Sequence, residues 1–543
     1  MPLLDAAGPR PWWQDATIYQ IYPRSFLDTD GDGVGDLEGV RRRLDHLAWL
    51  GVDALWLSPV FPSPMADFGY DVADYCDIDP VFGDLAVFDA LVGEAHERGL
   101  RVLLDWVPNH TSSLHPWFLD SRSGRGADRR SWYVWRDPAP GDGPPQSRPP
   151  NNWIRAWSDQ PAWTWDEASQ QWYLHLFLPE QPDLNWAEPA VEQAMHDTLR
   201  FWLDRGVDGF RMDVVHCIGK DPDLADDPAD LAALSHVPLN HRPETHRLLG
   251  GIRSVLDAYP GAMAVGEVYL LDTAEVVTYL GPDQLHLAFN FRPLLTRWDA
   301  PAWRRQIEVV AAEHEPRDVW PTWVLSNHDN PRHRTRYERP GAARAAAVLL
   351  LTLRGTPFLY AGEELGLADA AVGPDRVVDP GGRDGCRAPI PWDAGPTHGW
   401  ATDDPWLPWP PEVATTNLAT ERDEPEAIVH LYRRLLAARR ASPALTAGSL
   451  TLLDDLPDGV VGYRRSHPGA PERVVLVNFT DAAIDGVEVG PGRVEISSVG
   501  AGASEGRPWS GHLGPDEAVV LETAGVSPAD GASEPRGPAL PHP

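Results

Sequence analysis

The chain has 543 residues, a formal net charge of −34 at pH 7 and a hydrophobic fraction of 43%. This composition can build a sizeable core, which excludes a disordered polymer, and the length suggests roughly three to four domains. The acidic balance argues against nucleic acids and membrane surfaces as partners, because both would repel the chain. No apolar run approaches the roughly 20 residues of a transmembrane helix, and no signal-peptide pattern is visible.

The cysteines indicate the redox state of the compartment, and the tryptophans indicate the class of ligand. The three cysteines, Cys76, Cys217 and Cys386, are widely spaced and cannot all pair, which favours a reducing compartment, so we expect a cytoplasmic protein. The 24 tryptophans offer flat apolar faces with one N–H group, which suit stacking on sugar rings. Sugars are therefore the first expected ligands.

A module of helix, glycine and short apolar strand recurs around Gly51, Gly99 and Gly206. Helices that alternate with apolar strands predict βα units and a parallel sheet. Further strands are expected at 18–21, 263–265, 285–289, 323–325 and 356–359. About eight strands result, so the predicted fold class is α/β, a (β/α)₈ TIM barrel.

The uneven strand spacing predicts the domain organisation. Residues 111–185, rich in Pro, Gly and Trp, separate the third and fourth strands and predict an inserted, loop-rich domain after strand 3. Residues 1–110 and 186–445 would form the catalytic barrel. Short β runs over 446–526 predict a C-terminal antiparallel β-sandwich, and the Pro/Gly/Ala-rich tail 527–543 is expected to be disordered.

Acidic residues follow the predicted barrel strands, at the end where such barrels build their active sites. Asp105, Asp213, Glu267 and Asp329 stand there, each beside His, Arg, Asn or Gly. Like charges gathered in one pocket cost stability, so they are expected where function needs them. Glycoside hydrolysis uses two carboxyl groups that flank the scissile bond, with an oxocarbenium-like transition state between them.

The sequence resembles the α-amylase superfamily, glycoside hydrolase family 13. Its four conserved regions are matched in order by DWVPNH (105–110), GFRMD (209–213), GEV (266–268) and NHD (327–329). QPDLNW (181–186) and RDGCRAPIPW (383–392) resemble the oligo-1,6-glucosidase and α-glucosidase branch of that family. The resemblance covers roughly residues 12–525.

The resemblance implies roles for the residues at the strand ends. Asp213 would be the nucleophile, Glu267 the general acid/base and Asp329 the transition-state stabiliser. Arg211 would orient Asp213 and hold its pKa low. Asp105 would support Arg211 or the fold and is not predicted to be catalytic.

The resemblance also implies a pocket for one terminal glucose. Tyr70 would stack on the sugar, and His110 and His328 would bind its hydroxyl groups.

Residues outside the strand ends would close this pocket. Arg383 would pair with Asp67 over the non-reducing 4-hydroxyl, and Arg387 is left open as the alternative. Phe177 and Gln181, on the inserted domain, would line the entrance.

An acidic loop, DTDGDGVGD, predicts a structural metal site. It places oxygens at positions 1, 3, 5, 7 and 9 of an EF-hand-like loop, the seventh from a backbone carbonyl. The predicted ligands are Asp28, Asp30, Asp32, Val34 and Asp36. Position 12 is Gly39, so this is not an EF-hand. The branch that the chain resembles holds Ca²⁺ here, sometimes Mg²⁺; a solvated acidic turn is the alternative. No organic cofactor is expected.

The sequence therefore predicts a retaining, exo-acting α-glucosidase. Expected substrates are maltose, isomaltose and their short oligosaccharides, with sucrose as a further candidate. Val214 and Gln181 resemble the α-1,6-preferring members, although both linkages stay open. We expect a monomer or a homodimer.

Two alternatives remain. One is an α-glucosyl transferase or isomerase of the sucrose isomerase or trehalose synthase type. The RLDRD-type segment of isomaltulose formers is not found after Asp329, where the chain reads NPRHRTRY. The other is a non-catalytic carbohydrate-binding scaffold, which would not need three clustered acids.

Overall fold

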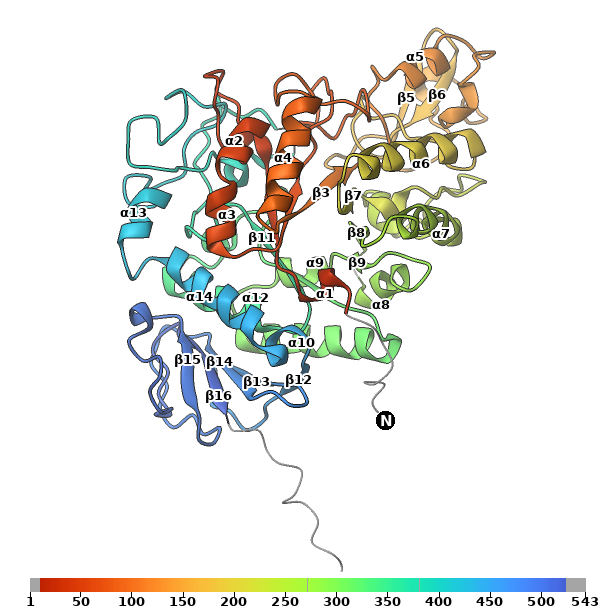
Figure 1. Cartoon of the computed structure of the whole chain (residues 1–543). Coiled ribbons are helices and arrows are strands. Elements are labelled where there is room, and N and C mark those ends of the chain that lie inside the picture. Colours follow the sequence, from red (N-terminus) through yellow and green to blue (C-terminus); the bar gives the residue numbers. More distant parts are fainter. Residues whose placement is uncertain (1–9, 271, 380, 524–543) are drawn as a thin grey trace, which may run out of the picture.

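The computed structural model describes residues 10–270, 272–379 and 381–523 (Figure 1). The predicted disordered tail, 527–543, lies outside the described residues. Three sheets organise the described chain: eight parallel strands, five antiparallel strands at the C-terminal end and three antiparallel strands in between.

The eight-stranded sheet forms a nearly closed barrel, which confirms the predicted TIM barrel. Its strands are β1 (Ile18–Ile21), β2 (Ala54–Leu57), β3 (Arg101–Trp106), β7 (Gly209–Met212), β8 (Met263–Gly266), β9 (Leu287–Ala288), β10 (Thr322–Val324) and β11 (Thr356–Tyr360). They pair in the order β10-β11-β1-β2-β3-β7-β8-β9. Across the remaining gap between β9 and β10, Thr322 Oγ1 donates to the Ala288 carbonyl at 2.8 Å.

Helices cover the outside of the barrel (Figure 1). The longer ones are α4 (Leu85–Glu97), α6 (Pro189–Asp204), α7 (Pro243–Asp257), α10 (Ala300–His314), α12 (Pro340–Thr352) and α14 (Ile428–Ala441). The shorter ones are α1 (Trp12–Asp15), α2 (Leu37–Arg42), α3 (Leu44–Leu50), α8 (Thr273–Val276), α9 (Phe291–Leu295), α11 (His333–Arg336), α13 (Leu418–Asp423) and α15 (Pro443–Thr446). None of the helices in the described part of the chain has the length and apolar character needed to cross a bilayer.

Helix α6 shows how the recurring module folds. Val191, Met195, Leu199 and Trp202 are buried at helical spacing, so one face of the helix packs on the barrel. Gly206 follows the helix at φ +93°, a left-handed conformation that a glycine adopts without strain and that turns the chain into β7.

The predicted insertion leaves the barrel after β3 and returns at α6. It contains α5 (Pro116–Arg122) and the sheet β4-β6-β5, formed by β4 (Trp135–Arg136), β5 (Trp163–Asp166) and β6 (Gln171–Leu174). Its core includes Trp153 and Leu176 and is shared with Val237 of the loop after β7. The insertion is therefore packed against a barrel loop, on the side where the strands end.

The C-terminal part is an antiparallel β domain, as predicted. Its strands β12 (Ser449–Leu452), β13 (Val460–Ser466), β14 (Glu472–Asn478), β15 (Arg493–Ser497) and β16 (Ala518–Thr523) pair in the order β12-β13-β14-β16-β15.

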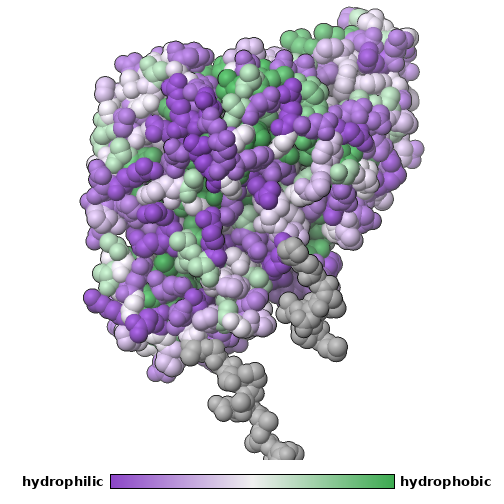
Figure 2. Space-filling model, in the orientation of Figure 1, coloured by the Kyte–Doolittle hydropathy of each residue, from purple (hydrophilic) through white to green (hydrophobic). Residues whose placement is uncertain are grey.

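Alternating residues of this sheet enter two different cores. Val475 and Val477 join the barrel core, whereas Val474 and Leu476 join a separate cluster. The layer over that second cluster comes from irregular segments tied by one bridge, Ile484 to Leu513, and not from a second regular sheet. Figure 1 places this domain, in blue, beside α12 and α14, and Figure 2 shows that hydrophilic residues dominate the same face of the molecule.

Candidate active site

A cavity of about 390 Å³ opens at the carboxyl end of the barrel strands. The three predicted catalytic acids line it: Asp213, Glu267 and Asp329. Six of the predicted substrate residues line it as well: Asp67, Tyr70, His110, Phe177, Val214 and Arg383. The other three predicted residues lie behind this lining and are described below: Gln181, Arg211 and His328.

Arg211 holds the central carboxylates together. It lies on β7 between β3 and β8, and its side chain is only 2% exposed. Its Nη1 lies 2.7 Å from Asp213 Oδ1 and 2.8 Å from Asp105 Oδ1, and its Nη2 donates to Glu267 Oε2. One buried guanidinium therefore brings the predicted nucleophile and the predicted acid/base to adjacent positions.

The electrostatics of Asp213 differ from the prediction. Burial raises the pKa of Asp213, and the carboxylates of Glu267 and Asp105 raise it further, against the attraction of Arg211. Burial likewise raises the pKa of Asp105 to about 6. The expectation that Arg211 holds the pKa of Asp213 low is wrong, because one guanidinium shared by two buried carboxylates and the partly buried Glu267 does not offset the desolvation of Asp213 and the repulsion among the three.

Val214 turns the chain directly after Asp213 in a strained conformation. Its φ is +32°, in the left-handed region that β-branched residues avoid. The turn places the Val214 backbone N–H 3.4 Å from Glu267 Oε2, and the next N–H, of Val215, donates to the Glu267 carbonyl at 3.1 Å. This strain thus accompanies a direct link between the Asp213 segment and Glu267.

His328 supports Tyr70 instead of facing the cavity. Its ring is parallel to the Tyr70 ring, with centroids 5.4 Å apart. Its Nε2 lies 2.6 Å from Tyr70 Oη, and its Nδ1 lies 2.7 Å from Gln20 Nε2. Burial lowers the pKa of His328 to about 3, so the imidazole is neutral near pH 7. The predicted contact of His328 with sugar hydroxyls stays a prediction, since both ring nitrogens already have protein partners.

Arg383 joins three carboxylates at one side of the cavity. It contacts Asp67 Oδ1 at 2.6 Å, Asp329 Oδ1 at 2.9 Å and Asp379 Oδ1 at 2.6 Å. Arg387 contacts Asp329 at 3.1 Å and Asp379 at 3.3 Å. Arg383 is therefore the arginine that pairs with Asp67, which decides between the two alternatives.

The charges around Asp329 keep it ionised. Burial alone would raise its pKa, but the guanidinium groups of Arg383 and Arg387 hold the pKa of Asp329 well below the usual range of a carboxyl.

Gln181 lies deeper than predicted. Its Nε2 is 3.1 Å from Asp67 Oδ2 and 3.1 Å from His110 Nε2, and the residue is fully buried. Phe177 packs on the other side of His110, with ring centroids 5.2 Å apart. Gln181 therefore orients two cavity residues, and of the two residues predicted at the entrance only Phe177 reaches the cavity.

Several residues of this site were not predicted from the sequence, and two of them, Asp379 and Trp157, contact Arg383. Asp379 binds both Arg383 and Arg387; its spacing of four residues from Arg383 was the available signal. Trp157, 46% exposed, lines the cavity with Arg383 Cζ 4.6 Å from its ring centroid. Nothing in the sequence distinguished Trp157 from the other tryptophans.

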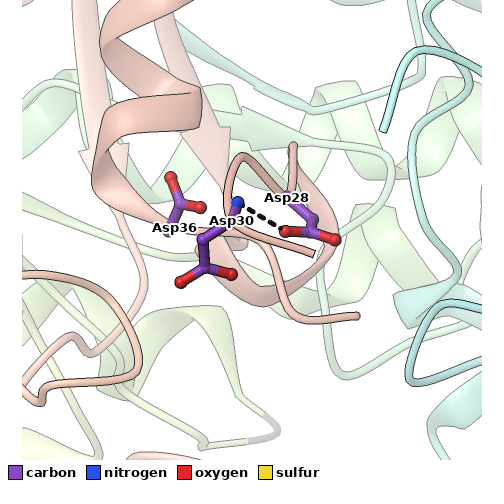
Figure 3. Close-up of side chains that lie close together, drawn as sticks. All are labelled: Asp28, Asp30 and Asp36. Atoms are coloured by element: carbon purple, nitrogen blue, oxygen red, sulfur yellow. Dashed lines mark hydrogen bonds between the residues drawn. The ribbon is translucent and has the colours of Figure 1, made fainter. Parts of the chain in front are cut away.

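The acidic loop gathers three of its four aspartates (Figure 3). Carboxylate oxygens of Asp28, Asp30 and Asp36 lie within 4.8 Å of one another, and Asp32 is not part of this group. Burial, together with the neighbouring carboxylate of Asp30, raises the pKa of Asp36. Asp36 also caps α2 by accepting from the Gly39 N–H at 2.6 Å. The loop thus concentrates negative charge that a hard cation would neutralise.

The comparisons with known proteins agree with this geometry. Residues 20–448 match the model of the α-amylase catalytic domain. A probable α-glucosidase of Rhizobium meliloti is 42% identical over 87% of this chain and 90% of its own length. An oligo-1,6-glucosidase of Parageobacillus thermoglucosidasius is 35% identical over 87% of this chain and 91% of its own length.

Solved structures of similar proteins superpose over nearly the whole chain. The α-glucosyl transfer enzyme XgtA matches with a TM-score of 0.86 at 38% identity, over 94% of this chain and 99% of its own. The trehalulose synthase MutB of Pseudomonas mesoacidophila MX-45 matches with a TM-score of 0.86 at 31% identity, over 95% and 100%. The chain therefore belongs to the α-amylase family of glycoside hydrolases.

Proposed function

We propose that this protein is a retaining, exo-acting α-glucosidase that releases glucose from short α-1,4- and α-1,6-linked glucosides. The observation that carries the proposal is the binding of Asp213 and Glu267 to the two ends of the Arg211 guanidinium, at the base of a cavity large enough for one sugar. Two adjacent carboxyl groups are the requirement for double displacement.

In the first step, Asp213 attacks the anomeric carbon while the glycosidic bond breaks. Glu267 donates its proton to the leaving oxygen, so the aglycone departs as a neutral alcohol. In the second step, Glu267 takes a proton from water, and the resulting nucleophile attacks the anomeric carbon and frees Asp213. Retention requires the two carboxyl groups to lie about 5–5.5 Å apart in the working enzyme.

The ionised Asp329 would stabilise the positive charge that develops on the sugar ring. Its pKa is held low by the guanidinium groups of Arg383 and Arg387, so it stays a carboxylate across the working range of pH. A fixed charge in a water-poor site acts on the transition state without reorganisation.

The exo mode follows from the contact of Arg383 with Asp67. This ion pair closes the cavity on the side away from the leaving group, which leaves room for one glucose unit beyond the reacting bond. His110 and Tyr70 line the same space and would bind and stack on that glucose.

The proposal is tested by initial rates on maltose, isomaltose, sucrose and trehalose, with Asp213→Ala as the control. We expect glucose release from maltose and isomaltose and none from the variant. Unchanged activity in Asp213→Ala would contradict the mechanism, and inactivity of the wild type on all four sugars would contradict the function.

A second candidate, α-glucosyl transfer, uses the same first step and a sugar instead of water in the second. The likeness to XgtA and MutB favours it. The ratio of glucose released to oligosaccharide formed at high substrate concentration separates the two functions, since transfer rises with acceptor concentration and hydrolysis does not.

We further propose that the acidic loop binds a structural Ca²⁺ ion, with Mg²⁺ as the alternative. Asp28, Asp30 and Asp36 would supply carboxylate oxygens, which are the ligands that these hard cations prefer. The cation would relieve the repulsion within the loop and connect it to the start of α2. Its place is the loop after β1, and it takes no part in the chemical steps.

The same proposal includes the setting of the enzyme. The free cysteines Cys76, Cys217 and Cys386 support a reducing, cytoplasmic location. A monomer or a homodimer is proposed, to be decided by light scattering coupled to gel filtration.

A further inference from the structure

Lys220 is the only lysine in the sequence; the rest of the 46 basic residues are arginines. The two side chains differ in shape, because arginine presents a planar fork of five N–H groups and lysine a compact ammonium with three. The contacts of this single ammonium therefore indicate what lysine does at this position that arginine would not do.

Lys220 lies beside the cavity, where three segments of the chain meet. Its Nζ donates to Asn109 Oδ1 at 2.6 Å and to the Cys217 carbonyl, and it forms an ion pair with Asp183 Oδ2 at 2.9 Å. Asn109 follows β3, Asp183 ends the insertion and Cys217 follows β7. The side chain is only 8% exposed, and these three oxygen atoms surround its ammonium group.

This contact fixes the orientation of the Asn109 amide. An ammonium can only donate, so the oxygen Oδ1 must face Lys220 and the nitrogen Nδ2 must point away from it. Nδ2 then lies 3.1 Å from Nδ1 of His110, which is a cavity residue. Because the amide nitrogen is a donor, this arrangement favours an unprotonated Nδ1.

A second amide donor faces the other ring nitrogen of His110. Gln181 accepts from the Leu178 N–H through Oε1 at 3.0 Å and donates to Asp67 Oδ2 through Nε2, which fixes this amide as well. The same Nε2 lies 3.1 Å from His110 Nε2. An imidazolium would thus turn an N–H group toward a donor on both sides, whereas a neutral imidazole does so on one side only.

The two charges near His110 oppose each other, and the charge of Lys220 acts in the same direction as burial. Burial lowers its pKa to about 4, Lys220 lowers it and Asp183 raises it. Asp67 lies farther away, beyond the Gln181 amide. Removing Lys220 would therefore leave Asp183 unopposed and free the Asn109 amide to present its oxygen to His110.

We propose that Lys220 is a positioning residue: it fixes the Asn109 amide and so keeps His110 a neutral imidazole at the glucose cavity. The inference rests on the proposed α-glucosidase function, since it concerns a residue of that site. Lys220 itself touches no substrate. It acts through Asn109 and through its ion pair with Asp183.

The test is the pH dependence of kcat/KM for Lys220→Met, which keeps the length of the side chain and removes its charge and donors. Protonation of His110 then occurs at higher pH, so the acid limb of the profile moves upward by about one pH unit. Because the pKa of His110 is about 4 in the wild type, we expect kcat/KM to fall about fivefold at pH 4 and to change little at pH 7, where His110 is neutral in both proteins.

Two further variants separate positioning from folding. Lys220→Arg keeps a charged donor and should retain the acid limb of the wild type, even if the larger fork lowers kcat/KM several-fold. Asn109→Ala removes the amide donor and should move the acid limb as Lys220→Met does; the double variant should move it no further. A double variant whose shift equals the sum of the two single shifts would show that Lys220 does not act through Asn109.

Arg122→Met is the matched control, because it removes a cation 2.7 Å from the buried Asp166 of the same insertion, away from the cavity. Its pH profile should equal that of the wild type. An unshifted acid limb in folded Lys220→Met overturns the inference. If Lys220→Met does not fold, an unshifted acid limb in Asn109→Ala overturns the inference instead. Both results require an active wild type, whereas failure of the proposed function appears as an inactive one.

Discussion

Arg383 binds Asp67 in the lining of the cavity, with 2.6 Å between Nη2 and Oδ1, although 316 residues separate the two in the chain. The same guanidinium also contacts Asp329 and Asp379. The side chain proposed to close the pocket is therefore coupled to the acid proposed to stabilise the transition state. Substrate enclosure and the charge of the site depend on one planar group.

Replacing Arg383 by lysine should weaken substrate binding more than turnover. An ammonium cannot contact three carboxylates in the plane of a fork, so the pocket closes less well and Asp67 is left poorly paired. We expect kcat/KM for maltose to fall by about 10²-fold, mainly through KM. Arg376→Lys, in the same loop but paired with the exposed Asp404, should leave kcat/KM unchanged. An equal loss in both variants would indicate a general disturbance of the loop.

Asp213→Asn should abolish activity and stabilise the fold. The amide cannot form the glycosyl intermediate, so we expect a loss of more than about 10⁴-fold in kcat. Because burial raises the pKa of the carboxyl, its ionised form destabilises the native state at neutral pH, and the neutral amide should raise Tm by about 2–4 °C. Thermal unfolding at pH 7 measures this; a lower Tm would contradict the electrostatic account.

The pH dependence of that stabilisation has a defined sign. A raised pKa means that the native state binds the proton more tightly than the unfolded chain. The stability contributed by protonated Asp213 is full below the unfolded pKa of about 3.9 and is lost as pH rises through the higher native pKa. The difference in Tm between Asp213→Asn and the wild type should therefore grow from pH 4 to pH 7. A constant difference would argue against a titrating carboxyl.

Calcium should raise Tm through the acidic loop. Binding to the native state alone stabilises it by about 2.7 kcal/mol when the free ion is at 100 times its Kd. Asp30→Asn removes a member of the three-carboxylate group and should abolish the effect of calcium and of chelators. Asp32→Asn, outside that group, should retain it. If Asp32→Asn also loses the effect of calcium, Asp32 is a ligand, as the sequence predicts.

Trp157→Ala should affect the part of the substrate beyond the terminal glucose. The ring lies at the cavity mouth with the Arg383 guanidinium against it, and it is half-exposed. Losing one aromatic surface and its cation–π contact should raise KM for maltotriose about fivefold to tenfold, with little change in kcat. Trp157→Phe should restore most of the affinity. A fall in kcat alone would place the role of Trp157 in the chemical step.

The sequence determined the barrel and the positions of its acids. Both follow from local patterns: helical burial such as that of α6, short apolar strands, and acidic residues just after those strands. Because parallel strands in a barrel all end at the same side, Asp213, Glu267 and Asp329 could be assigned to one cavity without coordinates.

Only the tertiary structure decided which side chains share which partner. Distances between segments far apart in the chain showed that Arg383, and not Arg387, pairs with Asp67, and that Gln181 and His328 lie behind the cavity lining. The backbone path of the acidic loop left Asp32 outside the group of the other three aspartates. The direction of the pKa shift of Asp213 needed the structure for the same reason. Desolvation depends on burial, and charge repulsion depends on distances through space. Both are set by tertiary packing and not by the local sequence.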